Sequence, residues 1–240
     1  MRLAIVYDNS TLDPALSAAW GFSCLVGYDL LFDTGADAPR LLSNMRRMGI
    51  DVGEIRTVVL SHIHGDHVGG LARILAANQG ITVYVPRSFP ASLKRQVKRS
   101  AHLVEVREPT EIAEGVYSTG EMGSGIREQS LALVTKQGLV VITGCAHPGI
   151  VEIVAKAKEI TGEEVYLAMG GFHLSGAGQG RIKAVIEEFR RLGVQRVAPC
   201  HCSGDLTRRS FKASYGEACI LVGVGSRLHV LEQATVSEGH

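Results

Sequence analysis

Three histidines and an aspartate lie within six residues, directly after the apolar run TVVL. The segment Ser61–His67 reads SHIHGDH, so His62 and His64 are two residues apart. In an extended chain, side chains at this spacing project to the same side, and the two rings can share one ion. Asp66 and His67 follow where the chain must turn toward a helix. Imidazole and carboxylate groups together suit zinc, and also manganese or iron, so the segment predicts a metal site. A surface histidine cluster without function is the alternative, but such runs seldom lie between a buried strand and a helix.

The composition limits the class of protein. The chain has 240 residues, of which 45% are hydrophobic, enough for a sizeable core. No apolar run approaches the roughly 20 residues that span a bilayer, and Met1–Asp8 resembles a strand rather than a signal peptide. A formal net charge of +1 argues against a general nucleic-acid binder. Five cysteines, an odd number, fit reduced thiols better than a disulfide framework. We therefore expect a cytoplasmic protein with no membrane and no nucleic-acid partner.

The elements that must position the histidine segment alternate between strand-like and helix-like runs. The expected strands are Leu3–Tyr7, Phe22–Val26, Leu30–Phe32, Thr57–Leu60, Ile81–Val85, Leu103–Val106, Val116–Ser118, Ser130–Thr135, Leu139–Thr143, Val165–Ala168, Arg196–Ala198 and Ala218–Val222. The expected helices are Ala38–Met48, one beginning at Val68, Ser88–Lys98, Ile150–Lys158 and Gly180–Leu192. The chain has no internal repeat and no low-complexity linker, so we predict one α/β domain over residues 1–240.

Four of the expected strands end at or just before a histidine: His62, His147, His173 and His201. In open α/β sheets, functional sites form at the carboxyl ends of strands, so we expect these side chains to converge. His201 lies in the tight loop PCHCSGD, and His147 precedes a proline at an expected helix start; we predict both as metal ligands. For His173, which follows two glycines, a ligand, a substrate contact and a buried structural histidine stay open.

Three further histidines are not expected to bind metal. His102 and His229 lie inside β-like runs, and His240 is terminal. Hydrogen-bonded or solvated side chains are the expectation for these three.

Cysteines and one aspartate adjoin the strand-end histidines. Cys145 is the best additional candidate for a metal thiolate, whereas Cys200 and Cys202 flank a histidine too closely and are expected to be small buried residues. Asp33 lies in an Asp-Thr-Gly sequence, but an aspartic protease needs a second such carboxylate and the chain has none. We expect Asp33 to hold a ligand imidazole through its remote N–H.

Two glycine-rich stretches, Gly120–Arg127 and Ser175–Arg181, are expected to form loops over the site. The second leads into a helix N-terminus that carries Arg181, where backbone N–H groups can bind a phosphate. It lacks the spacing of a dinucleotide-binding fold. Arg181 and His173 are therefore the candidate substrate-binding residues.

The HxHxDH motif at 62–67, the DTG at 33–35 and the late His201 together resemble the metallo-β-lactamase superfamily. The resemblance implies an αβ/βα sandwich, in which two mixed β-sheets pack together with helices outside. It also implies that His62 and His64 hold a first metal ion. A second ion would be held by Asp66, His67 and His201.

Further motifs are similar to the dihydropteroate-synthase-like branch of that superfamily: FDTG at 32–35, GGL at 69–71, ITGCAHPGI at 142–150 and GGFHL at 170–174. That branch includes the archaeal enzyme that joins a dihydropterin diphosphate to a ribofuranosylaminobenzene phosphate in methanopterin synthesis. One departure concerns the third motif. Hydrolases such as glyoxalase II carry a separate histidine and then a bridging aspartate after Thr-Gly, whereas Cys145 follows Thr-Gly here and no histidine lies between His102 and His147. Either His147 completes the first site, or that site is weak and the enzyme uses one ion.

These inferences predict a metal-dependent hydrolase that acts on a phosphorylated or otherwise anionic small molecule through a metal-bound water. Asp66 is the candidate catalytic residue, because it would both bind the metal and orient that water. The cofactor would be one or two divalent ions, zinc as first choice and Mn²⁺ or Fe²⁺ as alternatives. The alternative functions are a pterin-diphosphate transferase and a di-iron redox module. A nuclease has only the basic run Lys94–Arg99 in its favour, and a solvated helix face explains that run more simply.

Overall fold

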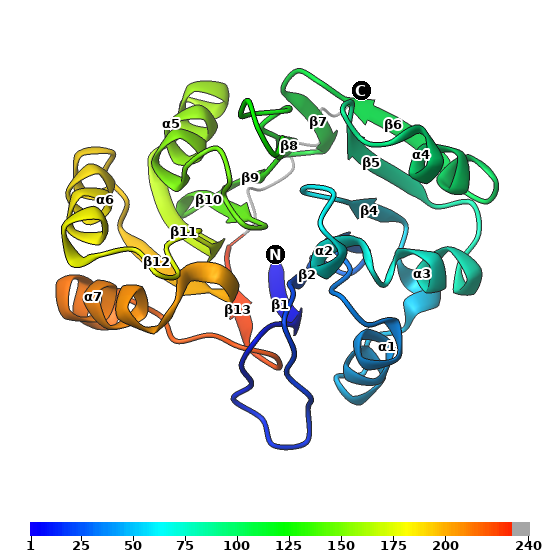
Figure 1. Cartoon of the computed structure of the whole chain (residues 1–240), viewed down its shortest axis with the longest axis horizontal. Coiled ribbons are helices and arrows are strands. Elements are labelled where there is room, and N and C mark those ends of the chain that lie inside the picture. The colour runs from blue at the N-terminus through cyan, green and yellow to red at the C-terminus, as the bar shows by residue number, and fades with distance from the viewer. Residues whose placement is uncertain (232–240) are drawn as a thin grey trace, which may run out of the picture.

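The computed structural model describes residues 1–231 and contains two β-sheets that face each other, with helices on the two outer sides (Figure 1). The first sheet has the strand order β13-β1-β2-β3-β4-β5-β6. Its strands are β1 (Arg2–Tyr7), β2 (Ser23–Val26), β3 (Leu30–Phe32), β4 (Thr57–Val59), β5 (Thr82–Pro86), β6 (His102–Val106) and β13 (Arg227–His229). From β3 to β6 the neighbours are parallel, and the remaining pairs are antiparallel.

The second sheet has the strand order β12-β11-β10-β9-β8-β7. Its strands are β7 (Thr110–Ala113), β8 (Val116–Ser118), β9 (Leu131–Thr135), β10 (Gly138–Thr143), β11 (Val165–Gly171) and β12 (Arg196–Cys200). The strands β10, β11 and β12 are parallel, whereas β7, β8 and β9 join through antiparallel pairs. Each sheet therefore has a parallel block whose strands end at one edge.

Seven α-helices lie among the described residues, most of them on the outer faces of the sheets (Figure 1). They are α1 (Ala38–Arg47), α2 (Gly65–Val68), α3 (Leu71–Ala77), α4 (Ala91–Lys98), α5 (Ile150–Thr161), α6 (Gln179–Arg191) and α7 (Asp205–Tyr215). No helix of the described residues is long and apolar enough to cross a membrane.

Three apolar clusters hold these layers together. One fills the space between the sheets, and each of the others packs a set of helices on one sheet. Between the sheets, representative buried side chains are Phe22, Phe32 and Ile142. On the inward faces of α1, α3 and α4 they are Leu41, Ile74 and Val97. On those of α5, α6 and α7 they are Ile153, Phe189 and Phe211. The predicted sandwich of two mixed sheets with external helices is confirmed.

Two of the expected elements differ from the structure. The predicted strand Ala218–Val222 is wrong: it starts at the end of a 3₁₀ turn, and only Cys219 forms an isolated bridge, to β12. In that run Cys219 and Val222 are buried and Leu221 is exposed, and the segment forms no ladder. The helix expected to begin at Val68 begins three residues later, as α3 at Leu71, and Val68 instead ends the short helix α2. Between the two helices the chain passes close to another segment at Gly70. A Cβ atom there would lie 2.3 Å from the Thr34 carbonyl oxygen.

Candidate metal centre

The ends of the parallel strands bring most of the predicted site residues together. Asp33 follows β3, and the histidine segment 62–67 follows β4 and continues into α2. On the other sheet, Cys145 and His147 follow β10, and His201 follows β12. Strands of one parallel block end at one edge, so residues far apart in the sequence meet there.

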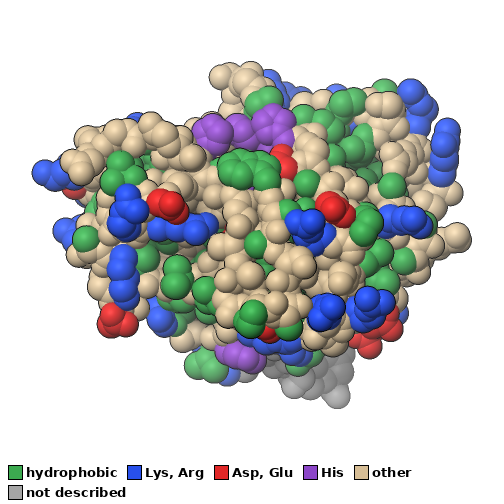
Figure 2. Space-filling model, turned by 60° about the horizontal axis from the view of Figure 1, so that its bottom comes forward, with side chains coloured by type: hydrophobic (Ala, Val, Ile, Leu, Met, Phe, Trp, Pro, Cys, Tyr) green, Lys and Arg blue, Asp and Glu red, His purple; other side chains and the backbone are tan. Residues whose placement is uncertain are grey.

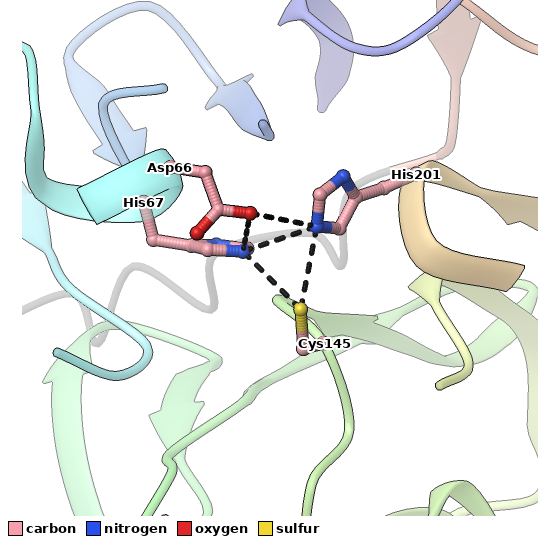
Figure 3. Close-up of side chains that lie close together, drawn as sticks. All are labelled: Asp66, His67, Cys145 and His201. Atoms are coloured by element: carbon pink, nitrogen blue, oxygen red, sulfur yellow. Dashed lines mark hydrogen bonds and ion pairs between the residues drawn. The ribbon is translucent and has the colours of Figure 1, made fainter. Parts of the chain in front are cut away.

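One group of four side chains, here called the Asp66 cluster, consists of Asp66, His67, Cys145 and His201, which point toward one another (Figure 3). His67 Nε2 lies 3.2 Å from His201 Nε2, and Cys145 Sγ lies 3.3 Å from each of these nitrogens. Asp66 Oδ2 lies 3.6 Å from His67 Nε2 and 3.4 Å from His201 Nε2. Ligands about 2.0–2.3 Å from a tetrahedral ion are about 3.3–3.8 Å from one another. Five of the six distances among the four atoms are therefore close to those of a tetrahedral metal site, and the sixth, between Asp66 and Cys145, is within 4.8 Å.

A second group, here called the His62 cluster, contains His62, His64 and His147. The ring centroids are 4.7 Å apart for His62 and His64, 4.5 Å for His62 and His147, and 4.9 Å for His64 and His147. Ligand atoms of His62, His147 and Cys145 also lie within 4.8 Å of one another, so Cys145 adjoins both clusters. His62 Nε2 is buried and has no hydrogen-bond partner. An unpartnered buried nitrogen among imidazoles fits a place for a cation.

Burial sets the charge of the two central imidazoles. Removal from water lowers the pKa of His62 to about 3, and the same effect lowers the pKa of His67 to about 3. Both rings are therefore neutral at pH 7, the form that binds metal. Burial opposes ionisation of Asp66, but its hydrogen bond to His201 and the nearby rings outweigh that effect and lower its pKa. The His201 pKa is raised, since its contact with Asp66 outweighs its burial.

Asp33 makes the contact expected from the sequence. Its carboxylate accepts hydrogen bonds from the backbone N–H and the hydroxyl of Ser61, each at 2.7 Å, and Oδ2 lies 2.7 Å from His67 Nδ1. The contact at Nδ1 leaves Nε2 of His67 for the Asp66 cluster. Its function as the holder of a metal ligand stays a prediction.

Glu128 is a site residue that the sequence reasoning missed. This fully buried carboxylate accepts hydrogen bonds from the backbone N–H groups of Cys145 and Ala146 at 2.9 Å and of His147 at 3.0 Å. It also contacts His147 Nδ1 at 2.9 Å and lies 3.9 Å from His62 Nδ1. The glycine-rich stretch just before it looked like a loop, and nothing in the sequence indicated that the next acidic side chain turns inward.

Unusual backbone geometry also concentrates here. Among the described residues, Asp33, Ala146, His173 and His201 are the non-glycine residues with positive φ, at 58°, 64°, 51° and 47°. Such conformations cost free energy and persist where surrounding contacts enforce them, commonly at functional sites. All four lie at the strand ends that build this centre.

The remaining predicted residues have clear positions. His173 is exposed, which excludes the buried structural reading, and it lines a cavity of about 160 Å³ together with His147 and Arg181. Cys200 and Cys202 are buried as expected, although Cys202 also lies near Cys145 and His173.

The histidines not expected to bind metal lie elsewhere or outside the described part. His102 begins β6 and His229 ends β13, and neither belongs to a potential metal-binding group of the described residues. His240 lies outside the described residues.

Comparisons with known proteins identify the family and agree with the fold. A family model of the metallo-beta-lactamase superfamily matches residues 25–167. The 7,8-dihydropterin-6-methyl-4-(beta-D-ribofuranosyl)-aminobenzene-5'-phosphate synthase of Methanocaldococcus jannaschii is 30% identical over 78% of this chain and 80% of its own length. The crystal structure of a metal-dependent hydrolase of the beta-lactamase superfamily has a TM-score of 0.84 and 29% identity, covering 97% of this chain and 100% of that one. Human tRNase Z, short form, shares the fold at 15% identity, with a TM-score of 0.67 over 96% of this chain and 99% of that one. The chain therefore belongs to the metallo-β-lactamase superfamily.

Proposed function

We propose that this enzyme is a metal-dependent hydrolase of a phosphorylated or otherwise anionic small molecule. The observation that supports it most is the Asp66 cluster, whose oxygen, nitrogen and sulfur atoms have the mutual spacing of a tetrahedral metal site. In this proposal, Asp66, His67, Cys145 and His201 hold one divalent ion. His62, His64 and His147 hold a second.

The donor set favours zinc. Imidazole nitrogens with one thiol and one carboxylate are a zinc-type combination, which iron also accepts and manganese accepts less readily. A divalent ion here would supply Lewis-acid chemistry, polarising a phosphoryl or ester oxygen and activating water.

The protein side chains would orient the reactants. The Asp66 side chain is 17% exposed, so it is reachable from solvent while contacting His67 and His201. Its lowered pKa keeps it ionised, and an ionised carboxylate can orient an attacking water by accepting its hydrogen bond. Asp66 is accordingly the proposed catalytic residue.

The substrate's anionic group would lie at the metal clusters, and a cavity beside the His62 cluster offers it further partners. His147, His173 and Arg181 line this cavity, which brings imidazole donors and a guanidinium group together. The pKa of His173 is raised by its hydrogen bond with Cys202, so this ring takes up a proton more readily than usual. Guanidinium and imidazolium groups are good partners for phosphate or carboxylate.

A pterin-diphosphate transferase is the second candidate, and the similarity to the methanogen synthase favours it. In that reaction the bound cation would neutralise a leaving diphosphate, and the acceptor rather than water would attack.

The test is to offer the purified, metal-loaded protein a pterin diphosphate with and without a ribofuranosylaminobenzene phosphate acceptor, alongside simple phosphate esters. Metal-dependent release of phosphate or alcohol without acceptor supports the hydrolase. Product formed only with acceptor supports the transferase and overturns the hydrolase. Elemental analysis of protein purified without added metal distinguishes both from a redox module, for which iron with a visible absorption band is expected.

The variant Asp66→Asn tests the catalytic assignment. The amide keeps the size of the side chain but loses the charge, so turnover should fall more than tenfold, about 1.4 kcal/mol in the barrier. Asp29→Asn, in the exposed turn between β2 and β3, is the matched control and should keep wild-type turnover. Turnover of Asp66→Asn within tenfold of wild type would contradict the role.

A further inference from the structure

An exposed aromatic side chain adjoins one end of the metal centre. Trp20 is the sole tryptophan of the chain, and its side chain is 57% exposed. Its ring centroid lies 5.1 Å from that of His201, with the ring planes at 54°. Figure 2 shows hydrophobic side chains beside the histidine group on this face of the molecule, with an acidic side chain next to them.

The loop that carries Trp20 is fastened to the site itself. Asn9 Oδ1 accepts the Gly21 N–H at 3.1 Å and lies 3.1 Å from His201 Nδ1. The Phe22 N–H donates to the Asp66 carbonyl oxygen at 3.2 Å. The residues on the carboxyl side of Trp20 are thus bonded, directly or through Asn9, to two members of the Asp66 cluster.

The residues before Trp20 are held as well. The Ala18 carbonyl oxygen accepts a hydrogen bond from Arg40 at 2.8 Å, and the Ala19 N–H donates to the Asp8 carbonyl oxygen at 3.0 Å. These hydrogen bonds hold the indole of Trp20 beside His201. The indole stays exposed, although burial in the core would stabilise an apolar ring.

Trp20 also ends a continuous row of rings across the centre. Neighbouring centroids in the row are 5.1, 4.9, 4.1, 4.5 and 4.5 Å apart, and the row runs Trp20, His201, His67, His62, His147, His173. The cavity with Arg181 lies at the His173 end. The two ends therefore differ in chemistry, one cationic and the other aromatic.

We propose that an aromatic group of the substrate stacks on Trp20. This aromatic group would lie on the His201 side of the metal centre, away from His173 and Arg181. The inference rests on the proposed function, because it takes the reacting phosphoryl group to lie at the metal clusters. Offset or tilted stacking on an exposed indole is favourable for any flat aromatic ring and needs no specific hydrogen bond. The preferred substrate class is accordingly an aryl or heteroaryl phosphate rather than an alkyl phosphate.

The test compares phenylphosphonate with methylphosphonate, which share the anionic group and differ in the ring. Binding to the Zn²⁺-loaded protein is measured by calorimetry, and the single tryptophan gives a fluorescence signal from the same position. We expect phenylphosphonate to bind threefold to tenfold more tightly and to change the indole emission. Trp20→Ala should lose this preference, whereas Trp20→Phe should keep most of it.

Tyr28→Ala is the matched control, because Tyr28 is 69% exposed and lies in the turn at the opposite end of β2. It should keep the preference for phenylphosphonate. Methylphosphonate binding without any aryl preference, or an unchanged preference in Trp20→Ala, overturns the role of Trp20 and leaves the proposed function standing. Failure of the wild-type protein to bind either phosphonate overturns both.

Discussion

The two halves of the molecule contribute to the metal centre in different ways. The N-terminal half supplies four candidate ligands from one six-residue segment at the end of β4. The C-terminal half supplies Cys145, His147 and His201 from the ends of β10 and β12, which are joined only through β11 in the sheet. The first set is local in sequence, and the second exists only once the sheet has formed.

The buried carboxylates that support the two halves also differ. Burial raises the pKa of Asp33 to about 7, against the hydrogen bonds from Ser61. Burial acts in the same direction on Glu128, but its bond with His147 and the nearby ring of His62 outweigh it and lower the pKa to about 2. Asp33 is therefore a hydrogen-bond acceptor that can take up a proton near neutral pH, whereas Glu128 stays charged. Of these two supporting carboxylates, only Glu128 in the C-terminal half is therefore permanently charged near pH 7.

The largest effect is expected from His67→Ala, which removes a candidate metal ligand of the N-terminal half. Removing one of four ligands should lower metal affinity at the Asp66 cluster at least about a hundredfold and abolish metal-dependent activity. The circular dichroism spectrum should stay native, because the ring lies in the short helix α2 at the metal centre rather than in an apolar cluster. Metal content by elemental analysis measures the loss. His102→Ala, at the start of β6, is the control that should bind metal normally, and full occupancy in His67→Ala would refute the assignment.

The next largest effect is expected from Glu128→Gln in the C-terminal half. The amide presents N–H groups to backbone donors, so at least one N–H of the Cys145–His147 loop loses its acceptor. We expect metal affinity of the His62 cluster to fall about 10–100-fold and the free energy of unfolding to fall by about 1–3 kcal/mol. Zinc titration and urea unfolding measure the two effects. Glu114→Gln, an exposed turn residue, is the control, and wild-type behaviour of Glu128→Gln would show that the loop does not depend on this charge.

A smaller effect, on the other cluster, is expected from Asp33→Asn. The side-chain amide can still accept from Ser61 but no longer fixes the proton of His67 on Nδ1. Affinity at the Asp66 cluster should therefore fall about tenfold, with little change at the His62 cluster. A two-step Co²⁺ titration followed by its visible bands separates the two sites. Equal losses at both sites in Asp33→Asn would remove the distinction between the halves.

The smallest effect near neutral pH is expected for the stability of the metal-free protein. The lowered pKa values of His62 and His67 remove stability as the pH falls below about 6.5, since the unfolded chain takes up protons first. The raised pKa of Asp33 acts in the opposite direction below about pH 7, whereas the raised pKa of His201 does so only above about pH 6.5. Because two histidines oppose one carboxyl, the free energy of unfolding should fall gradually between pH 6.5 and 5, by at most about 1.4 kcal/mol per pH unit.

Below about pH 4.5 the free energy of unfolding should fall more steeply. The lowered pKa values of Glu128 and Asp66 then add to those of the two histidines, and each group removes up to about 1.4 kcal/mol per pH unit. Urea unfolding of chelator-treated protein at pH 7, 5 and 3.5 should show a gradual fall followed by a steep one. A steep fall already between pH 7 and 5 would contradict the opposing shifts.

Much of this arrangement follows from the sequence because it is local. The HxHxDH segment fixes the spacing of four polar side chains within six residues. The apolar runs before the histidines predict the strands that end there. The family and the sandwich fold, inferred from these motifs, are confirmed. Asp33 was expected to contact a ligand imidazole without a named partner, and in the structure it contacts His67, because β3 and β4 are parallel neighbours that end at the same edge of the sheet.

Tertiary structure decided the rest, because it depends on contacts between segments that no local pattern relates. Glu128 looked like any acid after a glycine-rich loop, yet it turns inward to bind three backbone N–H groups from residues 145–147. Cys145 became a neighbour of both clusters only because Gly144 lets β10 end against Ser61, where a Cβ atom would lie 2.2 Å from the hydroxyl oxygen. Trp20 lies beside His201, 181 positions away in the sequence, because Asn9 contacts both Gly21 and His201. A short motif fixes the kind of chemistry, whereas the packing of the two sheets fixes which distant side chains complete it.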